Sequence, residues 1–158
     1  MEKRYYLAYG SNLNVRQMRS RCPGARIVGT AVLEDCRLLF KGGCGRAFLT
    51  IEPAEGFTVP VGVWEVGEED ERRLDRYEGF PGFYRKEELS VTIKGIKTGR
   101  ERNRKAFVYV MREGRQFGLP TEGYYLTCVE GYKDFGFDGR TLVEALALSG
   151  EELFNEEF

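Results

Sequence analysis

Short segments with the composition of β-strands follow one another through the first 111 residues of this chain. They are rich in β-branched, aromatic and other apolar residues, and turn-forming residues separate most of them. The segments are 4–9, 26–33, 36–40, 47–51, 59–66, 83–93 and 106–111. So many short strands with so few residues between them favour a curled sheet or a small barrel.

Helical patterns interrupt the strands once and replace them near the C-terminus. Residues 68–77 carry acidic side chains in the first turn and arginines in the middle, which suits the helix dipole, and Gly79 lies where a C-terminal glycine cap belongs. Further helices are expected at 120–132 and from 138 to an end at Ser149 and Gly150. We therefore expect one α+β domain over residues 1–158.

The charge balance and the apolar runs limit the partners and the compartment. The chain has 24 Lys and Arg against 25 Asp and Glu, which gives no reason to expect nucleic acid or an acidic membrane surface as a partner. No apolar run approaches the roughly 18–20 residues that span a bilayer. The cysteines lack Cys-x-x-Cys spacing, which favours reduced thiols in the cytoplasm; they are Cys22, Cys36, Cys44 and Cys128. The oligomeric state does not follow from the sequence.

The chain contains no histidine, and this absence restricts its chemistry. Ser-His-Asp and Cys-His catalysis are excluded, and so are zinc sites that use imidazole. The cysteines are badly spaced for an all-thiolate site, so we expect no metal. Any proton transfer must run through Glu, Asp, Lys, Tyr or Cys.

The stretch Tyr9-Gly10-Ser11-Asn12-Leu13 follows the first strand directly. Glycine breaks the strand, and Ser11, Asn12 and Asn14 are of types that turns and helix N-caps prefer. A strand that runs into such a turn and then into a helix start at 15–18 leaves backbone N–H groups pointing one way, which suits an anion. The same residues also fit an ordinary strand-to-helix turn without a ligand.

A basic run lies between the last two strands, with Lys or Arg at positions 94, 97, 100, 102, 104 and 105. A solvated hairpin tip is the simplest interpretation. Contact with nucleic acid is the alternative, although the run has no aromatic residue on which a base could stack. That alternative predicts an affinity that falls steeply with salt.

Two stretches of the chain together resemble a known family. Tyr-Gly-Ser-Asn ends the first strand at 9–12, and Leu-Asp-x-x-Glu-Gly at 74–79 precedes a Tyr-Arg strand start at 84–85. In this order and spacing they are similar to the gamma-glutamylcyclotransferase-like family, and the strands at 61–64 and 109–111 extend the resemblance. The resemblance implies a small, mixed, mostly antiparallel β-barrel with flanking helices. It also implies a reaction without a cofactor, in which a small-molecule γ-glutamyl substrate cyclises and releases 5-oxoproline and a free amine.

The resemblance also implies which residues form the site. It places the general base and acid at Glu78. The substrate-binding residues that it implies are Ala8, Tyr9, Gly10, Ser11, Asn12, Tyr84 and Tyr125. The neighbouring Tyr124 is the alternative for the last position.

The residues present suit this chemistry. An α-amine has a pKa near ~8 and is largely protonated at neutral pH, so a base must take its proton and an acid must later protonate the leaving nitrogen. One carboxylate can do both, and Glu78 ends a predicted helix, where the dipole raises a carboxyl pKa. Because nucleophile and carbonyl belong to one molecule, ring closure needs no Ser, Cys or His. The alternative is a module of the same fold that binds a small molecule or a protein without turnover.

Overall fold

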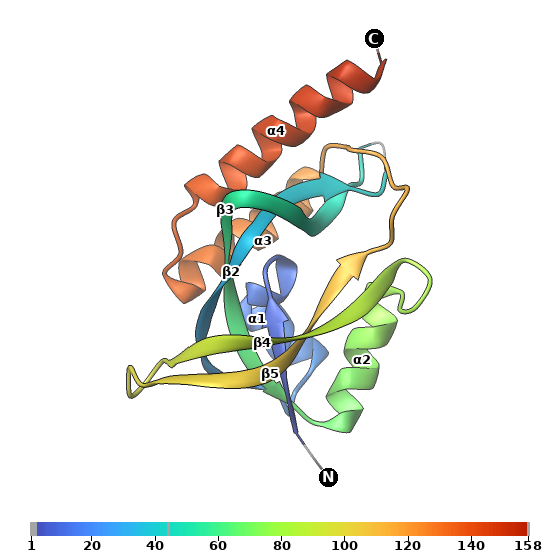
Figure 1. The fold of residues 1–158 in the computed structure, drawn as a ribbon. Helices are drawn as coiled ribbons and strands as arrows, with labels where there is room; N and C mark the ends of the chain where they lie inside the picture. Colours follow the sequence, from blue (N-terminus) through green and yellow to red (C-terminus); the bar gives the residue numbers. More distant parts are fainter. Residues whose placement is uncertain (1–2, 44, 158) are drawn as a thin grey trace.

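The computed structural model describes residues 3–43 and 45–157, so Cys44 lies outside the described residues. Within them the chain forms five strands, four α-helices and a short 3-10 helix, η1 (Figure 1). In chain order the elements are β1 (Arg4–Ala8), η1 (Ser11–Leu13), α1 (Val15–Arg21), β2 (Arg26–Lys41), β3 (Phe48–Val66), α2 (Glu68–Glu78), β4 (Tyr84–Gly95), β5 (Glu101–Met111), α3 (Glu122–Phe135) and α4 (Arg140–Glu157).

The strands form a closed barrel in the order β1-β3-β2-β4-β5. Neighbours in this order pair antiparallel, and β5 closes the barrel by pairing in parallel with β1 at Tyr6 and Phe107. The predicted α+β class and the small, mixed, mostly antiparallel barrel are therefore confirmed. The helices flank the barrel, and α4 extends away from it toward the C-terminus (Figure 1).

The second and third strands are longer than the sequence predicts. The predicted turn between 26–33 and 36–40 is wrong, because β2 runs through both segments. Asp35 has a φ of 55° at a shift in register with β3, so this position is a bulge within one strand. β3 likewise passes through Pro53 and Pro60. Both prolines precede Gly62, where the pairing of β3 with β1 begins. They therefore lie where one edge of β3 is not paired with β1, and a strand edge tolerates proline.

The last helix continues past its predicted end. Ser149 and Gly150 lie inside α4, which runs to residue 157, so the predicted stop is wrong. The buried Ser149 hydroxyl accepts a hydrogen bond from the Phe40 N–H at 2.9 Å and donates one to the Ala145 carbonyl at 2.7 Å. Ser149 therefore fastens α4 to β2 instead of ending the helix.

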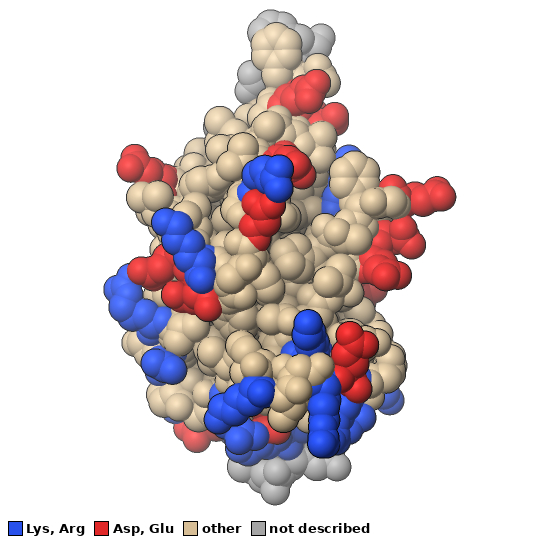
Figure 2. Space-filling model, turned by 90° about the vertical axis from the view of Figure 1, so that its left-hand side faces the viewer, with Lys and Arg blue, Asp and Glu red and all other residues tan. Residues whose placement is uncertain are grey.

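The basic run occupies the ends of β4 and β5 and the hairpin between them. Figure 2 shows lysines and arginines gathered toward the lower end of one face. Each cation of the run is exposed and forms no ion pair with another described residue; they are Lys94, Lys97, Arg100, Arg102, Arg104 and Lys105. This is the environment that the interpretation as a solvated hairpin requires. No helix among the described residues is long and apolar enough to cross a membrane.

β2 and β4 pair over a short stretch, and this contact leaves no room for a side chain at Gly29. The strands pair only where Gly29 meets Gly95 and Thr30 meets Lys94. A Cβ on Gly29 would lie 2.1 Å from the Lys94 carbonyl oxygen. Because that oxygen belongs to the backbone, it cannot move without separating the two strands.

Gly29→Ala is therefore expected to lower the free energy of unfolding by about 1–3 kcal/mol, the usual effect of an added methyl group in a filled space. Gly123→Ala is the matched control, since nothing lies within 4 Å of the methyl it adds near the start of α3. Urea denaturation compares the two variants. If Gly29→Ala is as stable as the control, the close contact at Gly29 does not limit the stability of the barrel.

Candidate functional site

Residues from both sequence motifs line one small hollow at the end of β1. It is lined by Tyr6, Tyr9, Gly10, Ser11, Asn12, Leu49, Glu78, Tyr84 and Tyr109. The lining residues come from every strand except β2, from the turn after β1 with η1, and from the end of α2. The hollow has a volume of about 20 Å³, which is room for about one water molecule. The fold thus brings Glu78 to the turn at 9–12.

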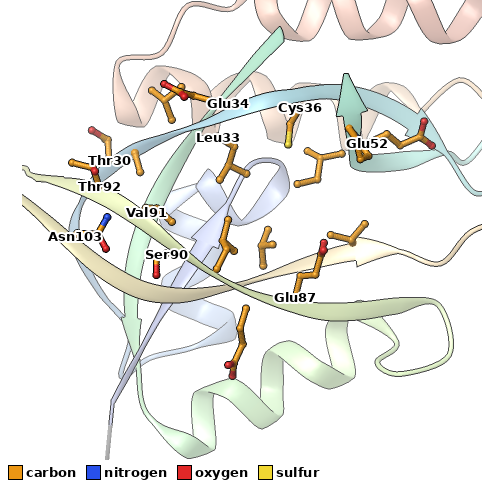
Figure 3. Close-up of a pocket in the computed structure, with 18 of the residues that line it drawn as sticks. Thr30, Leu33, Glu34, Cys36, Glu52, Glu87, Ser90, Val91, Thr92 and Asn103 are labelled. Carbon is orange, nitrogen blue, oxygen red and sulfur yellow. The ribbon is translucent and has the colours of Figure 1, made fainter. Parts of the chain in front are cut away.

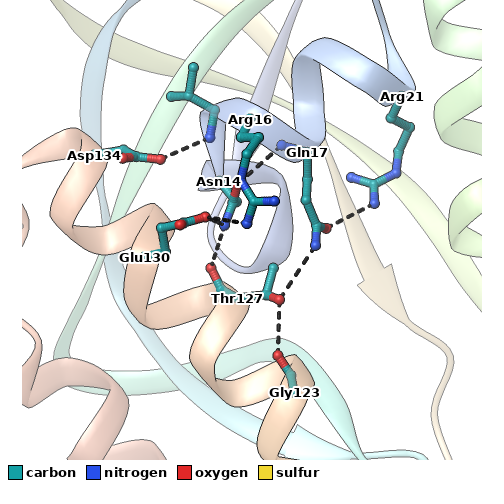
Figure 4. A network of polar contacts seen from close by, with 9 residues as sticks. Asn14, Arg16, Gln17, Arg21, Gly123, Thr127, Glu130 and Asp134 are labelled. Atoms are coloured by element: carbon teal, nitrogen blue, oxygen red, sulfur yellow. Dashed lines mark hydrogen bonds and ion pairs between the residues drawn. The ribbon is translucent and has the colours of Figure 1, made fainter.

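The turn after β1 is held in place by α3. Asn14 caps α1 by accepting a hydrogen bond from the Gln17 N–H at 3.1 Å. Its side-chain amide donates to the Thr127 carbonyl at 3.1 Å and to the Glu130 carboxylate (Figure 4). The two backbones approach so closely that a Cβ on Gly131 would lie 2.6 Å from the Asn14 nitrogen. Packing against α3 therefore fixes the position of the turn.

Asn12 connects the turn to Glu78. Its side-chain amide donates to the Tyr6 hydroxyl at 2.9 Å and to the Glu78 carboxylate at 3.4 Å. Its side-chain oxygen accepts from Arg21, and its backbone carbonyl accepts from the Trp64 indole N–H at 3.0 Å. Because Asn12 is buried, these bonds determine how its amide faces the carboxylate.

Glu78 is the last residue of α2, and Gly79 follows in the left-handed conformation with a φ of 65°, as the sequence predicts. The Glu78 residue is half-buried. Loss of water around the carboxylate raises its pKa from 4.5 to about 8, while the charge of Arg21 opposes this shift. Sequence reasoning attributes a raised pKa to the helix dipole, but burial is the main cause. A carboxyl group with such a pKa can both accept and donate a proton near neutral pH.

Three of the four tyrosines that line the hollow donate hydrogen bonds from their hydroxyl groups to protein oxygens. Tyr9 donates to the Tyr109 carbonyl at 2.7 Å, and Tyr84 donates to the Leu49 carbonyl at 2.7 Å. Tyr109 donates to the Asp75 carboxylate at 2.6 Å. Burial raises the pKa of the Tyr9, Tyr84 and Tyr109 hydroxyls well above the ordinary value. These groups therefore stay neutral and give the hollow its shape.

The structure does not bring every residue implied by the resemblance to the hollow. Ala8 is buried at the end of β1 and is not part of the lining. Tyr125 packs against Phe40, with ring centroids 6.1 Å apart, and is also outside the lining. Its neighbour Tyr124 lies nearer, because the Leu49 N–H donates to the Tyr124 hydroxyl at 3.1 Å.

Sequence reasoning misses Tyr6, Leu49 and Tyr109, which also line the hollow. Barrel closure brings the two tyrosines together, since their rings lie 5.7 Å apart across the junction of β1 and β5. A hydroxyl-bearing aromatic residue in an otherwise apolar strand is the signal that points to Tyr109. Leu49 carries no such signal.

A larger cleft lies on the other face of β5. It has a volume of about 720 Å³ and lies between β2 and β4, with Cys36 on one side and Glu87 on the other (Figure 3). Val108 and Val110 line this cleft, whereas Tyr109 between them lines the hollow at Glu78, because successive side chains of a strand point to opposite faces. None of the residues implied by the resemblance lines the cleft. Nowhere in the described part do three acidic or cysteine side chains gather as a metal ion requires.

The barrel with its flanking helices is shared with solved structures. One named gamma-glutamyl cyclotransferase superposes with a TM-score of 0.74 at 24% identity, covering 91% of this chain and 86% of the other. An AIG2-like protein from Mus musculus gives a TM-score of 0.55 at 24% identity, with coverages of 70% and 78%. A yeast gamma-glutamyl cyclotransferase specific to glutathione gives 0.64 at 11% identity, with coverages of 96% and 97%. At these identities the likeness shows a shared gamma-glutamyl cyclotransferase fold.

A match between the sequence and a family model identifies the family. The family model described as gamma-glutamyl cyclotransferase, AIG2-like, matches residues 6–127, and both motifs lie within this range. The chain therefore belongs to the AIG2-like gamma-glutamyl cyclotransferase family, and the resemblance inferred from the motifs is confirmed. No curated protein sequence matches it.

The raised pKa of Glu78 predicts that folding depends on pH. Its neutral form favours the folded state, so this contribution is complete below pH 4.5 and is lost as the pH rises to about 8. Glu78→Gln cannot ionise. Above about pH 8 its free energy of unfolding is expected to be larger than that of the unaltered protein by on the order of 1–3 kcal/mol. Urea denaturation across this pH range measures the difference. Glu69→Gln, on the exposed side of α2, should show no such trend; a pH-independent difference for Glu78→Gln would contradict the raised pKa.

Proposed function

We propose that this protein is a cytoplasmic, cofactor-independent γ-glutamyl cyclotransferase. The observation that carries the proposal is the half-buried Glu78 carboxyl, whose pKa is raised to about 8 and which accepts a hydrogen bond from Asn12 of the turn. A helix-end glutamate with a purely structural role would face water and keep an ordinary pKa. Membership of the family supports the same class of activity.

In the proposed reaction the substrate α-amine attacks its own γ-carbonyl carbon, and the Glu78 carboxylate takes the amine proton. A new C–N bond closes the five-membered ring while negative charge develops on the carbonyl oxygen. The original amide C–N bond then breaks as Glu78 returns the proton to the leaving nitrogen. The products are 5-oxoproline and a free amine, and no further reactant is needed. Positioning of the two ends of one molecule supplies much of the rate.

The turn offers groups that suit the glutamyl end of such a substrate. The first N–H groups of a helical turn have no partner inside it, so those of Ser11 and Asn12 are available for the α-carboxylate or the developing oxyanion. In this proposal Tyr9, Gly10 and Tyr84 form the surrounding wall. Room for one water molecule is too little for a glutamyl group, so side chains at the edge of the hollow must move outward on binding.

The proposal is tested by measuring 5-oxoproline release from a panel of γ-glutamyl compounds. Glu78→Gln keeps the size of the side chain and removes the base, so turnover is expected to fall by roughly 10²- to 10⁴-fold, the usual contribution of general acid–base catalysis. Circular dichroism verifies the fold, and Glu69→Gln is the matched control that should keep full turnover. Equal turnover by Glu78→Gln would remove Glu78 from the mechanism. Binding without turnover by the unaltered protein would favour the non-catalytic binding module.

The rate of the proposed reaction is expected to peak near pH 8. Burial raises the pKa of Glu78 to about 8, and an α-amine has a pKa of ~8. The productive complex holds one proton between the two groups, so kcat/KM should follow a bell-shaped curve around that pH. A pH profile of kcat/KM measures this, and a rate that keeps rising well above pH 8 would contradict the role of Glu78.

A further inference from the structure

Aromatic rings lie around the hollow at Glu78, and several of them are exposed. We name this group the aromatic mouth; it consists of Phe48, Tyr77, Phe80, Phe83 and Tyr124. Tyr77 is 43% exposed, Phe48 39% and Phe80 37%. Large apolar side chains that gather at the surface beside a candidate site indicate a binding surface.

On the α2 side, the mouth contacts the lining of the hollow directly. The Tyr77 hydroxyl shares a hydrogen bond with the Ser11 hydroxyl, with 2.9 Å between the oxygens. The Phe80 ring lies 6.5 Å from the Tyr109 ring. These rings therefore continue the wall that Glu78 and the turn begin.

On the barrel side, three rings form a continuous arc. The Phe83 ring lies 5.2 Å from that of Tyr84, which lines the hollow. The Phe48 ring lies edge-on to Phe83 at 6.1 Å and to Tyr124 at 5.1 Å. Tyr124 in turn accepts the hydrogen bond from Leu49, another lining residue. Phe48 is the exposed centre of this arc.

Cations already occupy ring faces of the mouth. The Arg21 guanidinium lies 3.5 Å from the centroid of Tyr77, and that of Arg115 lies 4.6 Å from the centroid of Phe83. Neither arginine forms an ion pair with an acidic side chain among the described residues. The mouth is thus apolar and carries positive charge at its edges.

We infer that the aromatic mouth binds the leaving amine and selects γ-glutamyl amides of bulky apolar amines over those of cationic amines. The inference rests on the proposed function. If the turn holds the glutamyl end and Glu78 faces the γ-amide, the amine must extend outward past these rings. Aromatic rings gain by burying apolar groups. A second cation would meet two guanidinium groups instead of free ring faces, which is repulsive.

The test uses two amides of matched length, γ-glutamyl-n-hexylamide and the mono-γ-glutamyl amide of cadaverine. They differ in that a terminal CH₃ of the first is replaced by NH₃⁺ in the second. We expect kcat/KM for the hexylamide to exceed that for the cadaverine amide by about tenfold or more. Discrimination of this size is usual when two substrates differ by one small group in an apolar pocket.

Variants of the mouth locate this preference. Phe48→Ala is expected to reduce the ratio of kcat/KM for the hexylamide to that for γ-glutamyl-methylamide by about tenfold, and Phe48→Leu to restore most of it. Phe57→Ala removes another exposed phenylalanine, 53% exposed, and is the matched control that keeps the ratio. A ratio between substrates is not changed by a loss of folded protein, so a merely structural role of Phe48 would leave it unaltered.

Calorimetric binding of both amides to Glu78→Gln separates this inference from the proposed function. Tighter binding of the hexylamide without any 5-oxoproline from the unaltered protein would refute the cyclotransferase and keep the apolar subsite. Equal turnover of the two amides, or an unchanged ratio in Phe48→Ala, would overturn the subsite while the cyclotransferase stands. Equal binding of the two amides without turnover would overturn both. Neither binding nor turnover of either amide would overturn both.

Discussion

The buried amide of Asn12 is the interaction on which the candidate site depends. It joins Tyr6 of β1 to the last residue of α2. The side-chain oxygen of Asn12 accepts from Arg21 of α1, and its backbone carbonyl accepts from Trp64 of β3. A carboxyl group on the final turn of a helix would otherwise be free to face solvent. Because each polar atom of the Asn12 side chain has a partner, a change there leaves buried groups unpaired, which is expensive in a low-dielectric environment. The position of Glu78 is thus a property of the whole fold.

The sequence predicts those parts of the structure that local chemistry decides. Acidic residues before arginines, followed by Gly79, define α2 without any tertiary information. Asp35 shows where prediction from local sequence fails. The residue types that favour a turn also favour a bulge, and only pairing with the partner strand β3 decides between them. Ser149 is similar, since its hydroxyl has a buried role that depends on Phe40, far away in the sequence.

The same distinction applies to the candidate site. Glu78 and the turn at 9–12 are found from the sequence because motif and spacing mark them. Tyr6 and Tyr109 meet only because β1 and β5 close the barrel, which no local pattern encodes. Neighbouring residues of a helix point about 100° apart, so the packing of α3 on the turn decides that Tyr124, and not Tyr125, reaches Leu49. The volume of a cavity does not identify the candidate site either, because the larger cleft lies on the face of β5 opposite to Glu78.

Trp64 gives the protein an internal optical probe. It is the single tryptophan of the chain, and its indole N–H is bonded to the backbone carbonyl of Asn12. Its ring also lies edge-on to Phe135 of α3, with centroids 6.1 Å apart. Indole emission responds to hydrogen bonding and to the local electric field, so a ligand that displaces the turn alters the intrinsic fluorescence. Displacement of the turn by a ligand is therefore readable in the unlabelled protein, from one indole whose surroundings are known.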